Sequence, residues 1–415
     1  MSTPAVRIAV ARTAALLGAA TAIAVVATAS SSASPPVSTM PAGGRFYASL
    51  EIPVGIHPTA VAAGSFGGDS GLDLVVPLYG ENEVALLIQD PPGQFRVATT
   101  VPVGFAPIAL AVGDVDSDGQ DDVVVACEGS GAVTILPGRG DGSFGPRRDV
   151  PTGAGPNSIA LGDLDRDGYL DVVVSHLNAH QITVLRGGAG GRLTLAGHYA
   201  TGRGPHEVVL ADLNDDGNVD ALTADGTGWT VTFLRGWGDG SFAKPRVFHS
   251  APRPRGLAVA DVNGDGALDV LTACVGDEVV SVFYGGGDGR CVSMDRLETW
   301  PRPFAVATAD WNGDGKPDVA VAQEAEASVT LHLSGAGPLP DVTETYWVGL
   351  GPRALLAADL NGDGLVDLAT ANASANSVSV LFQAGQAGPA ARPDLNPPSA
   401  VRPPLPSEPR KVRRP

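Results

Sequence analysis

The nine-residue stretch DLNGDGLVD, from Asp359 to Asp367, decides how this chain folds, because it recurs along the sequence at a fixed interval. Five equivalent stretches begin at Asp114, Asp163, Asp212, Asp261 and Asp310, and successive stretches are 49 residues apart: DVDSDGQDD, DLDRDGYLD, DLNDDGNVD, DVNGDGALD and DWNGDGKPD. A seventh stretch, SFGGDSGLD from Ser65, keeps part of the pattern. A strict period of this length is typical of a propeller, a solenoid or another repeat array.

Each acidic loop offers several oxygen atoms on one short turn, which is what a hard divalent cation requires. Positions one, three, five and nine of the loop would ligate through side chains, and position seven through its backbone carbonyl. The sequence therefore predicts calcium at up to six sites, held by Asp114, Asp116, Asp118, Gln120 and Asp122; Asp163, Asp165, Asp167, Tyr169 and Asp171; Asp212, Asn214, Asp216, Asn218 and Asp220; Asp261, Asn263, Asp265, Ala267 and Asp269; Asp310, Asn312, Asp314, Lys316 and Asp318; and Asp359, Asn361, Asp363, Leu365 and Asp367.

The side chains at position seven differ from loop to loop, as expected if only the main-chain oxygen is used there. Magnesium accepts few all-protein cages of this kind, and zinc is disfavoured because the loops contain no His or Cys. The first repeat is degenerate: Ser65 and Gly67 replace two ligands, and Asp69 and Asp73 remain.

The flanks of the loops distinguish a helical calcium module from a β-hairpin. Runs such as DVVVA follow the loops, and runs such as VTILPG come a few residues later, so both flanks are rich in β-formers. A fourth run follows a GDGSF turn, in which Asp-Gly suits a tight hairpin. Four strands in each of seven units predict an all-β, seven-bladed β-propeller.

The ends of such a ring must be joined, because open ends would expose sheet edges. The last repeat stops after its third strand, near Gln383, whereas Phe46 lies 49 residues before Phe95 of the first fourth strand. We therefore expect an N-terminal strand to complete blade seven, within a propeller that spans residues 46–383.

The loops of the form D-x-[DN]-x-D-G-x-x-D and the GDGSF turns resemble the VCBS or FG-GAP repeats of integrin α-subunit propellers, bacterial extracellular proteins and some fungal lectins. The resemblance implies a seven-bladed propeller whose calcium loops lie between strands one and two. Its calcium ligands transfer to the six intact loops.

The two ends of the chain differ in composition from this body. Residues 1–29 read as a signal peptide, with Arg7 and Arg12 before an apolar stretch that ends in Ala27-Thr28-Ala29. Residues 30–45 form a Ser- and Pro-rich linker, and residues 384–415 a Pro-rich basic tail predicted to be disordered. We expect a protein that is secreted or retained in the cell envelope; a signal segment kept as a membrane anchor is the alternative.

The chain carries a net charge of −18, and 24 of its 45 acidic residues lie in the seven loops, where calcium would neutralise them. This balance argues against nucleic acid as a partner. The three cysteines, Cys127, Cys274 and Cys291, do not suggest a disulfide framework. We expect a monomeric propeller with no membrane span after signal cleavage.

The residue after the repeated proline varies from blade to blade, as a binding surface would: Thr59, Ile108, Asn157, His206, Arg255, Phe304 and Arg353. The loops that carry these residues should lie on the face of the propeller opposite the acidic loops. An anionic glycan or a carboxylate could be held there by the guanidinium groups. The candidate ligand-binding residues are His206, Trp229, Arg255 and Arg353.

Three functions are consistent with these features. The first is an extracellular binding or adhesion module for a glycan or protein, without catalytic residues. The second is a polysaccharide-active lyase or dehydratase that would use His206 and Arg255 at the channel mouth. The third is a structural envelope protein attached through its basic tail. No nucleophile elbow, HExxH or phosphate-binding loop is present in the sequence.

Overall fold

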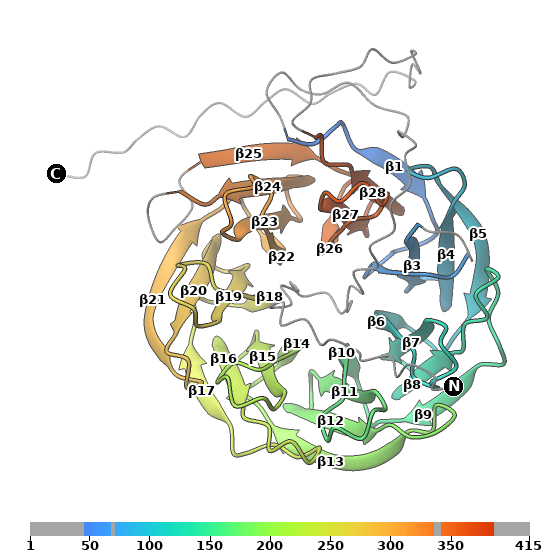
Figure 1. The fold of residues 1–415 in the computed structure, drawn as a ribbon, viewed down its shortest axis with the longest axis horizontal. Helices are drawn as coiled ribbons and strands as arrows, with labels where there is room; N and C mark the ends of the chain where they lie inside the picture. The colour runs from blue at the N-terminus through green and yellow to red at the C-terminus, as the bar shows by residue number, and fades with distance from the viewer. Residues whose placement is uncertain (1–44, 68–70, 336–341, 386–415) are drawn as a thin grey trace, which may run out of the picture.

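The computed structural model describes residues 45–67, 71–335 and 342–385. The signal peptide, almost all of the linker, the tail beyond residue 385 and Asp69 lie outside these residues. The described residues form seven separate four-stranded antiparallel sheets, arranged as blades around a central axis (Figure 1). The predicted seven-bladed β-propeller is confirmed.

Each blade runs outward from the axis in sequence order, and blade 7 takes its outer strand from the N-terminal end of the described chain. The strands of blades 1 to 4 are β2 (Ala62–Gly64), β3 (Asp73–Leu78), β4 (Glu83–Gln89) and β5 (Phe95–Pro102); β6 (Pro107–Gly113), β7 (Asp122–Cys127), β8 (Ala132–Leu136) and β9 (Arg148–Pro151); β10 (Pro156–Gly162), β11 (Asp171–His176), β12 (Gln181–Arg186) and β13 (Thr194–Ala200); and β14 (Pro205–Ala211), β15 (Asp220–Asp225), β16 (Thr230–Leu234) and β17 (Arg246–His249). The strands of blades 5 to 7 are β18 (Pro254–Ala260), β19 (Asp269–Cys274), β20 (Val279–Gly285) and β21 (Cys291–Glu298); β22 (Pro303–Ala309), β23 (Asp318–Gln323), β24 (Ser328–Leu333) and β25 (Val342–Trp347); and β26 (Pro352–Ala358), β27 (Asp367–Asn372), β28 (Ser377–Leu381) and β1 (Leu50–Pro53).

Burial changes in step with distance from the axis. The second strand of a blade is buried at every position in six blades, as in β7 with DVVVAC, and at all but one position of β19, because neighbouring blades cover both of its faces. The fourth strand is more exposed; β5, for example, alternates between buried or half-buried and exposed positions, because one of its faces meets solvent. Small and β-branched residues therefore dominate the inner strands.

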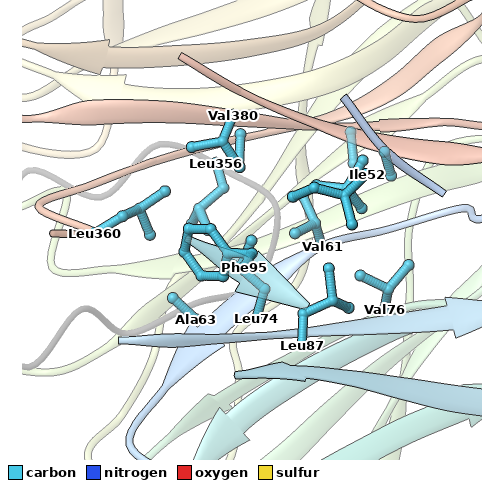
Figure 2. Packing of buried hydrophobic residues seen from close by; sticks show 14 of the residues in the cluster. Ile52, Val61, Ala63, Leu74, Val76, Leu87, Phe95, Leu356, Leu360 and Val380 are labelled. Atoms are coloured by element: carbon cyan, nitrogen blue, oxygen red, sulfur yellow. The ribbon is translucent and has the colours of Figure 1, made fainter. Parts of the chain in front are cut away.

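The ring closes by the predicted device. Strand β1 pairs antiparallel with β28, placing Ile52 opposite Val378, and Phe46 forms an isolated bridge with Gln383. Side chains of blade 1, including Val61 and Phe95, pack against Leu356 of blade 7 in one buried cluster (Figure 2). Hydrogen bonds thus attach the N-terminal segment to blade 7, and a continuous apolar core joins blade 7 to blade 1.

Strand register places the two kinds of loop on opposite faces. In blade 2, Gly113 pairs with Asp122 at the end of the sheet that carries the acidic loop, and Pro107 pairs with Cys127 at the other end. The repeated prolines therefore lie on the face opposite the acidic loops. The described residues contain no helix with the length and hydropathy of a membrane span.

Candidate functional site

The six intact acidic loops share one hydrogen-bonded shape. In blade 7, the Asp359 carboxylate accepts backbone N–H bonds from Asp363 at 3.1 Å and Gly364 at 2.8 Å. Asp363 in turn accepts the N–H of Leu365 at 2.9 Å. The same bonds recur in the loops that begin at Asp114, Asp163, Asp212, Asp261 and Asp310.

The donor chemistry of these loops fits calcium. In blades 2 and 3, three carboxylates of each loop bring oxygen atoms within 4.8 Å of one another: Asp114, Asp116 and Asp122, and Asp163, Asp165 and Asp171. The other four intact loops have Asn at position three, and its amide oxygen is the same kind of hard donor. The side chains at positions one, three, five and nine, with the carbonyl at position seven, would hold the ion.

The aspartate at position nine has a second partner set that does not involve a metal. One of its oxygens accepts the N–H of position two, and the other accepts an N–H sixteen residues further along, so the carboxylate ties the loop to the end of the third strand. This pair of bonds is present in all seven blades, at Asp73, Asp122, Asp171, Asp220, Asp269, Asp318 and Asp367. The sequence suggested only a ligand role for this position.

Burial raises the pKa of three of these aspartates, Asp122, Asp220 and Asp269, to about 6, and the backbone donors only partly offset that shift. Desolvation disfavours the charged carboxylate, and neighbouring loop carboxylates add to the effect. A divalent cation beside them would favour the ionised form.

The loops fall into two classes that the sequence analysis did not separate. In blades 5 to 7, position four is glycine in the left-handed region (φ 75 to 76°), and its N–H gives the position-one aspartate a further bond of 2.7 to 2.8 Å. In blades 2 to 4, the residue there is Ser117, Arg166 or Asp215, also with positive φ (53 to 62°), which is strained for a residue with a Cβ.

Arginines mark the same division. A loop carboxylate is ion-paired with an arginine in each of blades 2, 3 and 4: Asp116 with Arg148 at 4.0 Å, Asp165 with Arg186 at 2.8 Å and Asp216 with Arg235 at 2.7 Å. Among the described residues, the loop carboxylates of blades 5 to 7 have no such ion pair. Calcium would compete with a guanidinium group in the first class but not in the second.

The degenerate loop of blade 1 is supported by its neighbour. The Asp121 carboxylate, at position eight of the blade 2 loop, accepts the N–H of Ser65 at 2.8 Å. Position eight is apolar in the other intact loops, for example Leu170 and Val366. Asp121, the additional aspartate of the blade 2 loop, therefore stabilises the loop of blade 1, in which two ligand positions are lost.

On the opposite face, the first strands begin around a cavity of about 180 Å³, which we call the channel-mouth cavity. Two consecutive residues of every blade line it: Thr59 and Ala60, Ile108 and Ala109, Asn157 and Ser158, His206 and Glu207, Arg255 and Gly256, Phe304 and Ala305, and Arg353 and Ala354. All seven residues that follow the repeated prolines therefore meet in one place.

A β-bulge accounts for this convergence. In blades 2, 3, 4, 6 and 7, the register between the first two strands shifts between the proline and the second residue after it, and in blade 5 it shifts between Pro254 and Leu257. A bulge re-aims side chains that a regular strand would direct elsewhere. The residue before each proline also has positive φ, even where it is His57, Ala106, Arg253 or Arg302.

Three of the four predicted ligand-binding residues lie together in this cavity. Arg255 Nη1 lies 2.8 Å from His206 Nδ1, and the guanidinium groups of Arg255 and Arg353 lie 5.6 and 5.7 Å from the centre of the Phe304 ring. The fourth, Trp229, does not line the cavity; it is 52% exposed in the turn between β15 and β16.

The sequence analysis missed two acidic residues at this site. Glu324 accepts from Arg353 Nε at 3.0 Å and is ion-paired with Arg302 at 2.6 Å. Glu207 lines the cavity and accepts the N–H of Leu257 at 2.7 Å. Comparing the repeats could have revealed Glu207, because the other six blades have Ala, Ser or Gly at the equivalent position.

The protein environment disfavours the charged forms of two neighbouring groups, His206 and Glu207. Burial, then the adjacent Arg255 and Arg253, lowers the pKa of His206 to about 3. Burial raises the pKa of Glu207 well above its usual value, and the N–H of Leu257 only partly offsets that shift. The pKa shifts of His206 and Glu207 therefore both favour uncharged side chains beside the arginines of the cavity.

The sequence profile of the FG-GAP-like repeat matches residues 66–125, 114–174, 212–272, 262–321 and 310–370. Together these segments cover residues 66–174 and 212–370, which is more than half of the chain and includes all six intact acidic loops. A search of curated protein sequences finds no match.

Solved structures with the same fold are distant in sequence. BBS1N, crystallised in complex with ARL6DN, has a TM-score of 0.61 and 13% identity over 83% of this chain and 98% of its own. Virginiamycin B lyase from Staphylococcus aureus has a TM-score of 0.55 and 12% identity over 81% of this chain and 99% of its own. At these identities the likeness concerns the fold alone.

Proposed function

Because the chain belongs to the FG-GAP-like repeat family, we propose that it is a secreted, calcium-stabilised propeller that binds an extracellular glycan or protein at its channel mouth. One observation carries the proposal. In a scaffold that repeats every 49 residues, seven side chains that differ from blade to blade converge on a single cavity. Function is argued from such a site and not from the fold.

Calcium would act on stability in this proposal, since the acidic loops lie on the face away from the cavity. At ten times its Kd, each ion would contribute about 1.4 kcal/mol to the free energy of unfolding. Thermal melting of the secreted product with calcium and with a chelator tests this part. A melting temperature that does not change with calcium would contradict it.

Ligand binding is tested by screening the secreted product on a glycan array in the presence of calcium. Ile108→Trp would fill the cavity from its uncharged side and should abolish binding. Val247→Trp, on the outer strand β17 where Val247 is 48% exposed, is the matched control and should bind normally. Binding that survives Ile108→Trp in a folded protein would place the ligand elsewhere.

The secretion part is tested by sequencing the N-terminus of protein recovered from culture medium. Cleavage after Ala29 is expected. Recovery of the chain only in the membrane fraction, with its N-terminus intact, would instead indicate a retained anchor.

Geometry favours binding over the alternative lyase reaction. A lyase would need a base in the cavity, and His206 is the nearest candidate. Its Nδ1 lone pair accepts from Arg255, so the proton of the neutral ring resides on Nε2 and neither nitrogen is free to accept another. If the protein formed an unsaturated uronate from an acidic polysaccharide, the lyase alternative would be supported instead.

A further inference from the structure

The channel-mouth cavity is electrically lopsided. Its charged lining residues are Arg255, Arg353 and Glu207, and the environment favours the uncharged form of Glu207. The lining from blades 1 to 3 consists of Thr59, Ala60, Ile108, Ala109, Asn157 and Ser158, which carry no charge. A chain with a net charge of −18 therefore concentrates positive charge on one side of its axis.

The two arginines differ in how they are neutralised. Arg353 donates from Nε to Glu324 at 3.0 Å, and its Nη1 lies 3.1 Å from His57 Nε2, so it has a carboxylate partner and a fixed position. Arg255 has no ion pair with any described residue. Its polar contact is the neutral ring of His206, and its Nε is buried without a hydrogen-bond partner.

A partly buried guanidinium group without a contacting anion is unfavourable, because the protein has removed water from it and placed no carboxylate within ion-pair distance. Burial, followed by the neighbouring Arg253, lowers the pKa of Arg255 to about 10, which records that cost. Arg255 thus lacks an anion in contact with it, and its Nε lacks an acceptor. A ligand carboxylate supplies both, because its two oxygens match the guanidinium fork.

We propose that Arg255 binds the terminal carboxylate of the ligand, with Phe304 beside the group that carries it and Arg353 as a second, already neutralised cation. This inference rests on the proposed function and names its ligand class. The cavity of about 180 Å³ is smaller than the roughly 300 to 1,000 Å³ of sites for drug-sized ligands, so it admits one terminal residue. A uronate at the end of a glycan and the C-terminus of a peptide share this chemistry.

Calorimetric titration of the secreted product in calcium tests the proposal, with four organic probes and one inorganic anion. The probes are galacturonate, galactose, N-acetyl-leucine and N-acetyl-leucine amide, and the anion is sulfate. Galacturonate or N-acetyl-leucine should bind, and the matching neutral compound should bind at least tenfold more weakly. Binding of galacturonate alone indicates a glycan, and binding of N-acetyl-leucine alone indicates a peptide C-terminus.

Arg255→Gln should weaken carboxylate binding at least tenfold, and Arg255→Lys, which keeps the charge without the fork, should restore only part of it. Arg203→Gln is the matched control, since Arg203 is exposed and does not line the cavity. Thermal melting of each variant checks that it is folded. If Arg255→Gln does not fold, Arg255→Lys takes its place in the binding test.

Several results would overturn the inference. Equal affinity for galactose and galacturonate, abolished by Ile108→Trp, would sustain the proposed function but remove the carboxylate. Sulfate binding as tight as that of the carboxylates would make the site a general anion site. If the glycan array is positive but none of the probes binds, the carboxylate proposal is rejected and the proposed function stands. If neither the array nor the probes show binding, both are rejected.

Discussion

Arg255 Nη1 donates a hydrogen bond of 2.8 Å to Nδ1 of His206, and the two residues occupy the same position in consecutive blades, 49 residues apart. An arginine can only donate, so His206 must be the neutral tautomer with its proton on Nε2. The side chains of two repeats thereby form one unit at the axis, which neither repeat could form alone.

This unit makes stability depend on pH. The folded pKa of His206, about 3, lies below its ordinary 6.5, so between these values the unfolded chain binds a proton that the folded chain does not. Stability should therefore fall as pH decreases from 6.5 toward 3, by at most about 1.4 kcal/mol per pH unit for this residue. Urea unfolding at pH 7 and pH 5 should show a smaller loss for His206→Gln.

Other groups titrate in this range, so the comparison between wild type and variant is decisive and the slope of either alone is not. Burial also lowers the pKa of His332 to about 4, and that residue is unchanged in the variant. An identical pH dependence for wild type and His206→Gln would show that His206 is not kept neutral by the fold.

The aspartate at position nine should stabilise a blade even in the repeat that lacks two of the predicted calcium ligands. Asp73 of the degenerate repeat accepts the N–H groups of Phe66 at 3.1 Å and Gln89 at 3.0 Å. Asp73→Ala would leave buried donors unpaired and should cost roughly 2 to 3 kcal/mol. Urea unfolding should show the same loss in calcium and in chelator.

Asp269→Ala is the matched variant in an intact loop, because Asp269 makes the equivalent bonds to Val262 and Gly285. It should cost a similar amount in chelator and more in calcium, since it removes a ligand as well as the two acceptors. If Asp73→Ala also reduced the stabilisation by calcium, the degenerate loop would have to be counted as a metal site.

Removing Arg235, which pairs with a carboxylate of the acidic loop of blade 4, should tighten metal binding in that loop. Arg235 is ion-paired with Asp216 at 2.7 Å, and an exposed pair of this kind is worth up to about 1 kcal/mol. Arg235→Ala should therefore raise the affinity of this loop by about two- to fivefold. Terbium luminescence excited through Trp237, whose ring centre lies 4.8 Å from the Arg235 guanidinium, reports on this loop.

Subtracting the signal of Trp237→Phe proteins isolates the blade 4 loop from other sites. Arg246→Ala is the control, because Arg246 lies on β17 of the same blade and has no ion pair with a described loop carboxylate. An unchanged affinity in Arg235→Ala would mean that the arginine does not compete with the metal.

Ring closure should depend on Phe46. Its side chain is fully buried, with its ring centre 5.2 Å from that of Tyr346 and 6.5 Å from that of Trp311, so it anchors the N-terminal segment against blades 6 and 7. Phe46→Ala should cost about 3 to 5 kcal/mol. Leu50→Ala, at a position 36% exposed on β1, should cost far less in the same urea titration.

Limited proteolysis provides the second readout for closure. In Phe46→Ala the N-terminal segment should be cleaved faster while the inner strands stay protected. Equal stability of the Phe46 and Leu50 variants would indicate that the backbone pairing of β1 with β28 is sufficient to close the ring.

Sequence alone was enough to predict the blades, the acidic loops and the strand from Phe46 that closes blade 7, because these features follow from local patterns repeated in register. Strand period, turn chemistry and ligand spacing are set by residues within a few positions of one another. The family profile and the seven sheets confirm the repeat and the propeller.

Only the tertiary structure showed that Asp121 supports the loop of Ser65, and that Arg255 lacks the carboxylate partner that Arg353 has in Glu324. These relationships join residues of different blades. They depend on how the ring brings first strands to one axis and on a bulge that turns the residue after each proline inward. A repeat pattern records what the blades share, whereas the site is made from the positions at which they differ.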